Sequence, residues 1–307
     1  MDLPQAVSIR EVGPRDGLQN EPPVPTAGKI ALLEALSRTG LRRIEAVSFV
    51  HPRAIPQMAD ADAVWAAATP VPGVLYSALV PNRRGAERAL AAGFTNLEVV
   101  VSASDTHNRQ NVGRTTAASL VDLATVADLV HARGGTCEVV VSTAWGCPYE
   151  GDVPVERVLE VASSAVGAGA DRLTYGDTTG MATPTRVEDL VTRTSEVLPT
   201  TPLGLHFHNT RGTGLANVLA ALQLGVTDFD ASVGGLGGCP YAPGASGNIA
   251  TEEVVHMLED MGVATGVDLD ELLEVAAQAQ ELVGHELPSQ VLKAGPRTRR
   301  TPIPAAE

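Results

Sequence analysis

Short apolar runs alternate along the chain with longer segments rich in alanine and leucine. The apolar runs are rich in valine and isoleucine, which favour strands, and eight such runs can be counted. They cover residues 7–13, 43–50, 74–80, 96–103, 136–144, 171–178, 203–209 and 228–235. The segments between them have the composition of helices. Several of these helical segments end at a glycine, namely Gly40, Gly93, Gly134, Gly169 and Gly225, as left-handed helix caps commonly do.

Strand and helix alternating eight times indicate a parallel sheet with helical crossovers. We therefore predict an α/β protein, a (β/α)8 TIM barrel, with an extra C-terminal helical region over residues 250–262 and 269–284. A doubly wound open sheet is the alternative architecture. Residues 1–287 are expected to form one catalytic barrel domain, and the proline-rich residues 288–307 to form a disordered tail.

Composition and charge indicate which partners the protein can bind and in which cellular compartment it is expected. The chain has 307 residues and a formal net charge of −14, which argues against a nucleic-acid partner because such a surface must be basic. We find no run of 18 apolar residues and no secretory signal pattern, so we expect no membrane association. The 3 cysteines are few and odd in number, which is typical of reduced thiols in a cytoplasmic protein.

Polar residues gather where the predicted strands end. In a (β/α)8 barrel the active site lies at the carboxyl ends of the strands, so these residues are candidates for chemistry. They are Arg15 and Asp16 after the first strand, Glu45 and Ser48 in the second, Asp177 and Thr178 at the sixth, His206 and His208 in the seventh, and Cys239 and Asn248 after the eighth.

The sequence "HFHN" places two histidines on one face of a strand, because side chains two residues apart share a face. Barrel closure brings Asp16 on the first strand close to His206 and His208 on the seventh. Two imidazoles and one carboxylate favour a metal site with open positions for substrate. The same set of ligands also suits an iron(II) oxygenase.

Arg15 and Cys239 are candidates for catalysis beside that site. Adjacent strand residues point to opposite faces, so we expect Arg15 to act separately from Asp16, as a fixed cation for an oxyanion. Cys239 lies in a glycine-rich loop, where an accessible thiol can donate or accept a proton. Cys137 is expected to be a buried apolar side chain, and the role of Cys147 stays open. The histidines at positions 51, 107, 131 and 256 have no partner at ligand spacing and are expected at the surface or in loops.

Several motifs together resemble one enzyme family. The segments "EVGPRDGLQNE", "EAVSFVHPRAIPQMAD", "GCPYEG", "GDTTG", "HFHNTRGTGLANVLAALQLG" and "GGLGGCPYAPGASGNIATEEVVHML" are similar to 3-hydroxy-3-methylglutaryl-CoA (HMG-CoA) lyases. These are (β/α)8 members of a metal-dependent superfamily of lyases and Claisen-condensing enzymes. The similarity extends over residues 6–285.

The resemblance implies a role for each matching residue. Asp16, His206, His208 and Asn248 would bind Mg²⁺ or Mn²⁺, Arg15 would stabilise an enolate, and Cys239 would be the acid or base on a mobile loop. Glu45, Ser48, Asp177 and Thr178 would support the substrate and Arg15, and Asn111 would reach the substrate. Asp16 or His206 would be the general base. The implied reaction is retro-Claisen cleavage of HMG-CoA to acetyl-CoA and acetoacetate, by a homodimer that binds an acyl-CoA.

Two positions depart from the family pattern as we expect it. Asn209 replaces an acidic residue and Arg211 replaces an aromatic one, at a rim where we expect the acyl group to lie. A lyase for another 3-hydroxy-3-alkyl acyl-CoA, such as citramalyl-CoA, or a related ketoacid aldolase is therefore an alternative. A metal- or acyl-CoA-binding barrel without catalysis is a third hypothesis.

Overall fold

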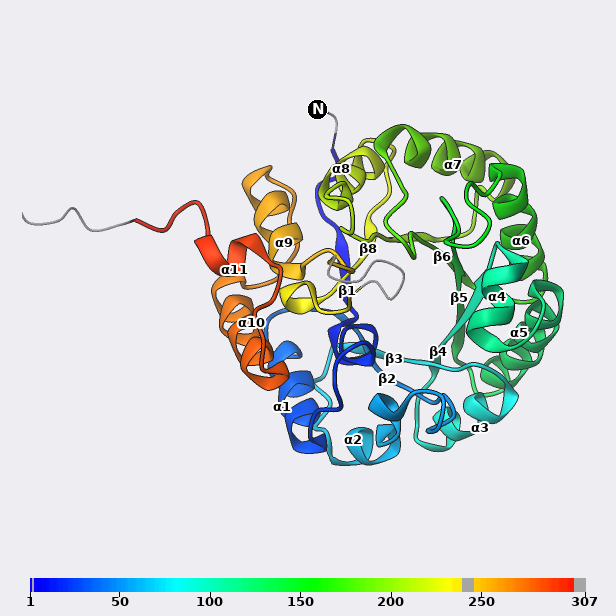
Figure 1. Cartoon of the computed structure of the whole chain (residues 1–307), viewed down its shortest axis with the longest axis horizontal. Helices are drawn as coiled ribbons and strands as arrows, with labels where there is room; N and C mark the ends of the chain where they lie inside the picture. Colours follow the sequence, from blue (N-terminus) through cyan, green and yellow to red (C-terminus); the bar gives the residue numbers. More distant parts are fainter. Residues whose placement is uncertain (2, 239–245, 301–307) are drawn as a thin grey trace, which may run out of the picture.

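The computed structural model describes residues 1, 3–238 and 246–300. It contains a closed barrel of eight parallel strands in the order β1 to β8 (Figure 1). The strands are β1 (Ser8–Glu11), β2 (Arg43–Ser48), β3 (Leu75–Leu79), β4 (Asn96–Ser102), β5 (Thr136–Ser142), β6 (Arg172–Gly176), β7 (Leu203–His206) and β8 (Asp228–Ala231). Pairing of β1 with β8 closes the barrel. The (β/α)8 prediction is confirmed, and the open sheet is excluded.

Helices surround the barrel. They are α1 (Thr26–Leu36), α2 (Ala61–Ala67), α3 (Arg83–Ala91), α4 (Asp105–Val112), α5 (Thr116–His131), α6 (Val155–Gly167), α7 (Pro184–Val197) and α8 (Gly214–Gln223), followed by α9 (Thr251–Asp260), α10 (Leu269–Val283) and α11 (Gln290–Ala294). The last three lie on one side of the barrel, where α10 contacts α1 (Figure 1). No helix in the described part of the chain is long and apolar enough to cross a membrane.

Three short helical turns complete the fold. They are the π-helical turn η1 (Gly13–Gly17) and the 3₁₀ turns η2 (Pro56–Met58) and η3 (Val233–Gly235). Of these, η1 and η3 follow β1 and β8, which pair with each other. Both turns therefore lie at the carboxyl rim of the barrel, where a site is expected.

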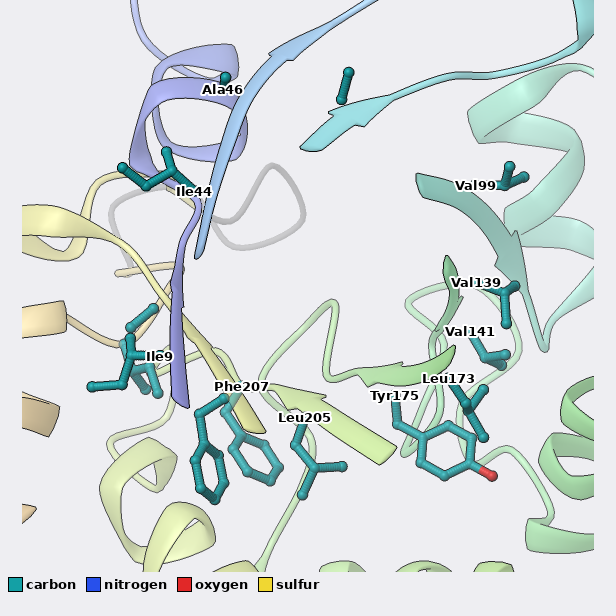
Figure 2. Close-up of a cluster of buried hydrophobic side chains, with 14 of the residues drawn as sticks. Ile9, Ile44, Ala46, Val99, Val139, Val141, Leu173, Tyr175, Leu205 and Phe207 are labelled. Atoms are coloured by element: carbon teal, nitrogen blue, oxygen red, sulfur yellow. The ribbon is translucent and has the colours of Figure 1, made fainter. Parts of the chain in front are cut away.

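Alternation along the strands separates an apolar outer face from a polar interior. Side chains such as Ile9, Val139, Leu173 and Leu205 are buried against the helices on the outer face of the sheet (Figure 2). The intervening side chains project into the barrel, and many of them are charged. This pattern explains why most of the strands are apolar at every second position.

A buried network of charges fills the barrel interior. The Arg10 guanidinium lies 2.8 Å from a carboxylate oxygen of Glu98 and 2.8 Å from one of Glu138. It also donates two hydrogen bonds to Asp230, of 2.8 and 2.7 Å. Below this layer, Arg43 contacts Glu138 at 2.9 Å. Buried charges are stable only when they are paired, and here strands far apart in the sequence supply the partners.

Two sequence predictions need correction. The predicted disordered tail begins too early, because Gln290–Ala294 forms α11 and Ser289 is buried and caps this helix through Leu292 N. Residues 301–307 lie outside the described residues. The segment after β4 contains α4, whose N-terminus is capped by the Ser104 hydroxyl. That helix was not predicted, since its sequence DTHNRQNV lacks an apolar stripe.

Candidate active site

A cavity of about 670 Å³ opens at the carboxyl ends of the strands. Its walls include Arg15 and Asp16 from η1, together with Ser142, Gly176 and His206 at the ends of β5, β6 and β7. This is the end of the barrel at which the sequence analysis placed the candidate residues. The cavity is large enough for the acyl end of a small-molecule substrate.

Asp16, His206 and His208 converge on one side of this cavity. One potential ligand atom from each residue lies within 4.8 Å of the others. The two Nε2 atoms of the histidines are 3.1 Å apart, and Asp16 Oδ2 is 4.0 Å from His206 Nε2. Two imidazole nitrogens and a carboxylate facing one point fit a divalent cation.

Asn248 completes this cluster. It forms an isolated bridge with His208, and its side-chain amide donates to Asp16 Oδ2 at 2.8 Å and to the Leu236 carbonyl at 3.0 Å. Its Oδ1 is buried and has no hydrogen-bond partner among the described residues. A buried amide oxygen without a partner is costly, and a cation at the cluster would satisfy it.

Burial and neighbouring charges set the protonation states of Asp16 and His208. Burial opposes ionisation of Asp16, but Arg15 and the two histidines lower the pKa of its carboxyl to about 2. Burial, together with His206, lowers the pKa of His208 to about 3. At neutral pH the cluster therefore offers an ionised carboxylate and a neutral imidazole, the forms that bind metals.

The turn η1 explains why Arg15 and Asp16 lie between two glycines. A side chain at Gly17 would begin 2.8 Å from Leu236 Cβ, and one at Gly13 would begin 2.6 Å from Glu11 Oε1. Only glycine allows this turn to pack so closely against its neighbours. The packing fixes the two functional side chains at the cavity wall.

Arg15 and Asp16 contact each other, contrary to prediction. Arg15 Nη1 is 2.6 Å from Asp16 Oδ1, and Arg15 Nη2 is 2.6 Å from Glu45 Oε2. The prediction was wrong because it assumed a strand, whereas the two residues lie in a helical turn and do not alternate between faces. Arg15 is 8% exposed and still lines the cavity, so it can also face a substrate.

Of the other predicted site residues, some line the cavity and others lie buried beside it. Thr178 lines the cavity, as does Asn111 from α4. Asp177 is buried and accepts hydrogen bonds from the backbone nitrogens of Met181 and Ala182, so it shapes the loop after β6. Ser48 is buried at the end of β2, outside the cavity lining.

The three cysteines differ in what can be said of them. Cys239 lies outside the described residues, so its role stays a prediction from sequence. Cys137 is fully buried, as expected. Cys147 is buried too, and its thiol lies 3.0 Å from the Ser104 hydroxyl and accepts from the backbone nitrogens of Tyr149 and Glu150. These contacts give Cys147 a structural role in its loop.

The two departures from the family pattern do not reach the cavity lining. The Asn209 amide oxygen accepts a hydrogen bond from Gly214 N at the start of α8. Arg211 Nη1 donates to the carbonyls of Thr179 and Gly180, at 2.6 and 3.2 Å. Both residues hold loops at the carboxyl rim and lie outside the cavity lining, so an effect on the acyl group stays a prediction.

Asp230 and His107 are among the cavity residues that sequence reasoning missed. Asp230 on β8 lines the cavity and contacts His206, and His107 on α4 lines it although a surface position was expected. The signal for Asp230 was present, because "DFDA" alternates acidic and apolar residues within a buried strand. Nothing in the spacing of His107 indicated its burial.

The fold and the site define this chain as a (β/α)8-barrel protein whose functional residues lie at the carboxyl rim. Residues 6–278 match the family described as HMGL-like. A hydroxymethylglutaryl-CoA lyase of Bacillus subtilis is 48% identical over 95% of this chain and 98% of its own length. The chain belongs to the HMGL-like family, and it is a carbon–carbon lyase. The resemblance inferred from the motifs is therefore confirmed.

Two further relatives bear on the substrate. An (R)-citramalyl-CoA lyase of Chloroflexus aurantiacus is 45% identical, over 95% of this chain and 96% of its own. The solved structure of an HMG-CoA lyase from Acinetobacter baumannii in complex with coenzyme A and 3-methylmalate is 44% identical. It superposes with a TM-score of 0.93 and covers 98% of both chains. The chain is thus similar to lyases that are named for two different acyl-CoA substrates.

Proposed function

We propose that this protein cleaves HMG-CoA to acetyl-CoA and acetoacetate by a retro-Claisen reaction that depends on Mg²⁺ or Mn²⁺. The observation that supports this proposal is the convergence of Asp16, His206 and His208 beside the Arg15 guanidinium in one cavity, with Asn248 hydrogen-bonded to Asp16. A cation site next to a fixed positive group suits a substrate that has an alcohol and a thioester carbonyl close together.

The cation and the side chains would have separate roles in the reaction. A divalent cation bound at the cluster would lower the pKa of the tertiary alcohol of the substrate. Asp16 or His206 would accept the alcohol proton, since both border the cavity; for His206 this requires that its Nε2 is free of the cation. Arg15 would face the carbonyl oxygen of the thioester and stabilise the enolate that forms when the carbon–carbon bond breaks.

Protonation of the enolate carbon would complete the reaction, and we assign it to Cys239 from the sequence alone. The test is Cys239→Ser, which removes a thiol whose pKa can approach neutrality. Turnover should fall by roughly a hundredfold or more, because acid–base catalysis contributes 10²–10⁴-fold. Normal turnover would contradict this role.

A second candidate reaction is cleavage of (R)-citramalyl-CoA, favoured by the 45% identity to the Chloroflexus lyase. Its carboxylate is attached directly to the carbinol carbon, one methylene closer than in HMG-CoA. Incubation with each thioester in the presence of Mg²⁺ or Mn²⁺ separates the two. Acetoacetate from HMG-CoA supports the main proposal, and pyruvate from citramalyl-CoA supports the second. No acetyl-CoA from either would contradict both.

Metal dependence and assembly need their own measurements. Removal of bound metal by a chelator should abolish turnover, and Mg²⁺ or Mn²⁺ should restore it; full activity in the chelated protein would contradict the proposed cofactor. We also propose a homodimer, which sedimentation at micromolar concentration would detect. Cytoplasmic location remains our prediction from the cysteine content, and fractionation of the source cells would test it.

A further inference from the structure

Asp230 has no role in the reaction proposed above, yet it lies against the cluster. It is 6% exposed, lines the cavity and projects from β8. Its Oδ2 lies 3.1 Å from His206 Nδ1, the ring nitrogen on the opposite side from the cluster. The His206 ring therefore stands between Asp230 and the potential metal ligands.

Asp230 is held in its ionised form by Arg10. Arg10 Nε and Nη2 donate to the two carboxylate oxygens at 2.8 and 2.7 Å, a bidentate contact. An ionised carboxylate can only accept hydrogen bonds.

This restriction determines the tautomer of the neutral His206 ring. Since Asp230 Oδ2 can only accept, the proton of His206 must be on Nδ1 for the 3.1 Å contact to be a hydrogen bond. His206 Nε2 then keeps its lone pair, and this atom lies 3.1 Å from His208 Nε2 and 4.0 Å from Asp16 Oδ2. In the opposite tautomer, with the proton on Nε2, the lone pair of His206 Nδ1 would face the Asp230 carboxylate and repel it.

We infer that Asp230 is a positioning residue, which fixes the His206 ring with Nδ1 protonated and Nε2 directed at the cation site. The inference rests on the proposed function in one respect, namely that the cluster binds a divalent cation. A carboxylate behind a ligating histidine orients the ring and makes it a stronger ligand. Through Arg10, the charge network from β4 and β5 also bears on this histidine, since Arg10 contacts Glu98 and Glu138 as well.

The first test needs no variant and no metal. Nitrogen-15 NMR of the imidazole rings of the metal-free protein, at about pH 8 and above the ordinary histidine pKa of ~6.5, reports which nitrogen of His206 carries the proton. We expect protonated Nδ1 and unprotonated Nε2, assigned by loss of the signals in His206→Gln. A protonated Nε2 with a bare Nδ1 would overturn the inference, whether or not the protein binds a metal.

The second test compares two aspartates on the same strand. Asp230→Asn places an amide NH₂ group where only acceptors fit, facing either Arg10 or His206. Asp228→Asn is the matched control, because Asp228 also projects inward from β8 and contacts two arginines, Arg43 at 2.9 Å and Arg172 at 3.0 Å. Among the described residues, no hydrogen bond or ion pair joins Asp228 to His206.

Titration with Mn²⁺ in a calorimeter gives the decisive comparison. Asp230→Asn should weaken Mn²⁺ binding by roughly 10–100-fold, the usual effect of removing such a carboxylate. Asp228→Asn should stay within about twofold of the wild type, even if its melting temperature falls. Equal weakening in both variants, or wild-type affinity in Asp230→Asn, would overturn the inference. If the wild type bound no Mn²⁺, the proposed function would fail, and the NMR result alone would decide the role of Asp230.

Discussion

Arg15 of η1 and Glu45 of β2 form a buried ion pair, with 2.6 Å between Nη2 and Oε2. Glu45 is completely inaccessible, so its carboxylate serves to fix the guanidinium and cannot itself reach a substrate. Together with Asp16, it leaves the Arg15 side chain a single orientation at the cavity wall. Fixed donors of this kind stabilise a developing oxyanion without reorganisation.

Arg15→Gln should therefore lower kcat by about a hundredfold or more, because one good electrostatic donor contributes roughly 3–4 kcal/mol to the transition state. Metal content should change little, since Arg15 is not among the proposed ligands. Steady-state kinetics together with metal analysis measure both quantities. Arg15→Lys keeps the positive charge but cannot contact Asp16 and Glu45 through two separate nitrogens. Its kcat should lie between those of the wild type and of Arg15→Gln. Near-full turnover in Arg15→Gln would contradict the assigned role.

His208→Ala should weaken Mn²⁺ binding by about a hundredfold or more. The substitution removes one of the two imidazoles at the cluster. Losing a ligand should weaken binding more than losing a residue that only hydrogen-bonds to a ligand, which costs about 10–100-fold. Calorimetric titration of the metal-free protein measures it. His131→Ala is the control, because His131 lies on α5 and pairs with Asp171 at the exposed surface. Unaltered metal stoichiometry and affinity in His208→Ala would remove it from the ligand set.

Strand periodicity was sufficient to predict the barrel. Eight apolar runs matched eight strands because each needs an outward apolar face to bury against helices, as with Val139 and Val141 of β5. The boundaries were less accurate: the seventh run was expected to extend to residue 209, but β7 ends at His206. His208 lies beyond it, in an isolated bridge with Asn248, and still points to the cluster.

Contacts that depend on neighbouring strands could not be predicted residue by residue. The pairing of Arg15 with Asp16 requires a π-helical turn, which the residue types alone do not specify. The contact of His206 with Asp230 requires the register of β7 against β8, where these two residues are paired. Sequence spacing was sufficient to predict His206 and His208 as ligands. It could not predict Asp230, which orients His206, because Asp230 lies on another strand.

Gly176→Ala should alter substrate binding without loss of stability. Gly176 lines the cavity at the end of β6, beside His206 of β7. A methyl group there would meet no atom closer than 3.5 Å, so the fold can accept it while the cavity narrows. We expect KM for HMG-CoA to rise by roughly 5–150-fold, because one methylene of misfit in a pocket costs about 1–3 kcal/mol. An unchanged KM, with a melting temperature equal to that of the wild type, would show that the acyl group lies elsewhere.

Glu11 should make stability depend on pH. This buried carboxylate accepts from the backbone nitrogens of Gly13 and Val233, at 2.7 and 2.9 Å, and from the Thr251 hydroxyl at 2.6 Å. Burial outweighs these hydrogen bonds and raises the pKa of Glu11 from 4.5 to about 7. Between those pH values the folded state keeps a proton that the unfolded state has lost, so stability falls as pH rises.

Glu11→Gln removes this dependence and preserves the contacts, because its amide oxygen can accept from both nitrogens and its amide nitrogen can donate to Thr251. Urea unfolding of both proteins between about pH 5 and 8 measures the difference. The variant should gain roughly 1–3 kcal/mol relative to the wild type as pH rises through this window, and the difference should level off above pH ~7. Glu252, which is also buried and has a raised pKa, is present in both proteins, so its own contribution cancels apart from its electrostatic coupling to Glu11. A difference that stays constant with pH would show that Glu11 is already ionised in the folded protein, and that the backbone nitrogens of η1 and η3 suffice to stabilise its charge.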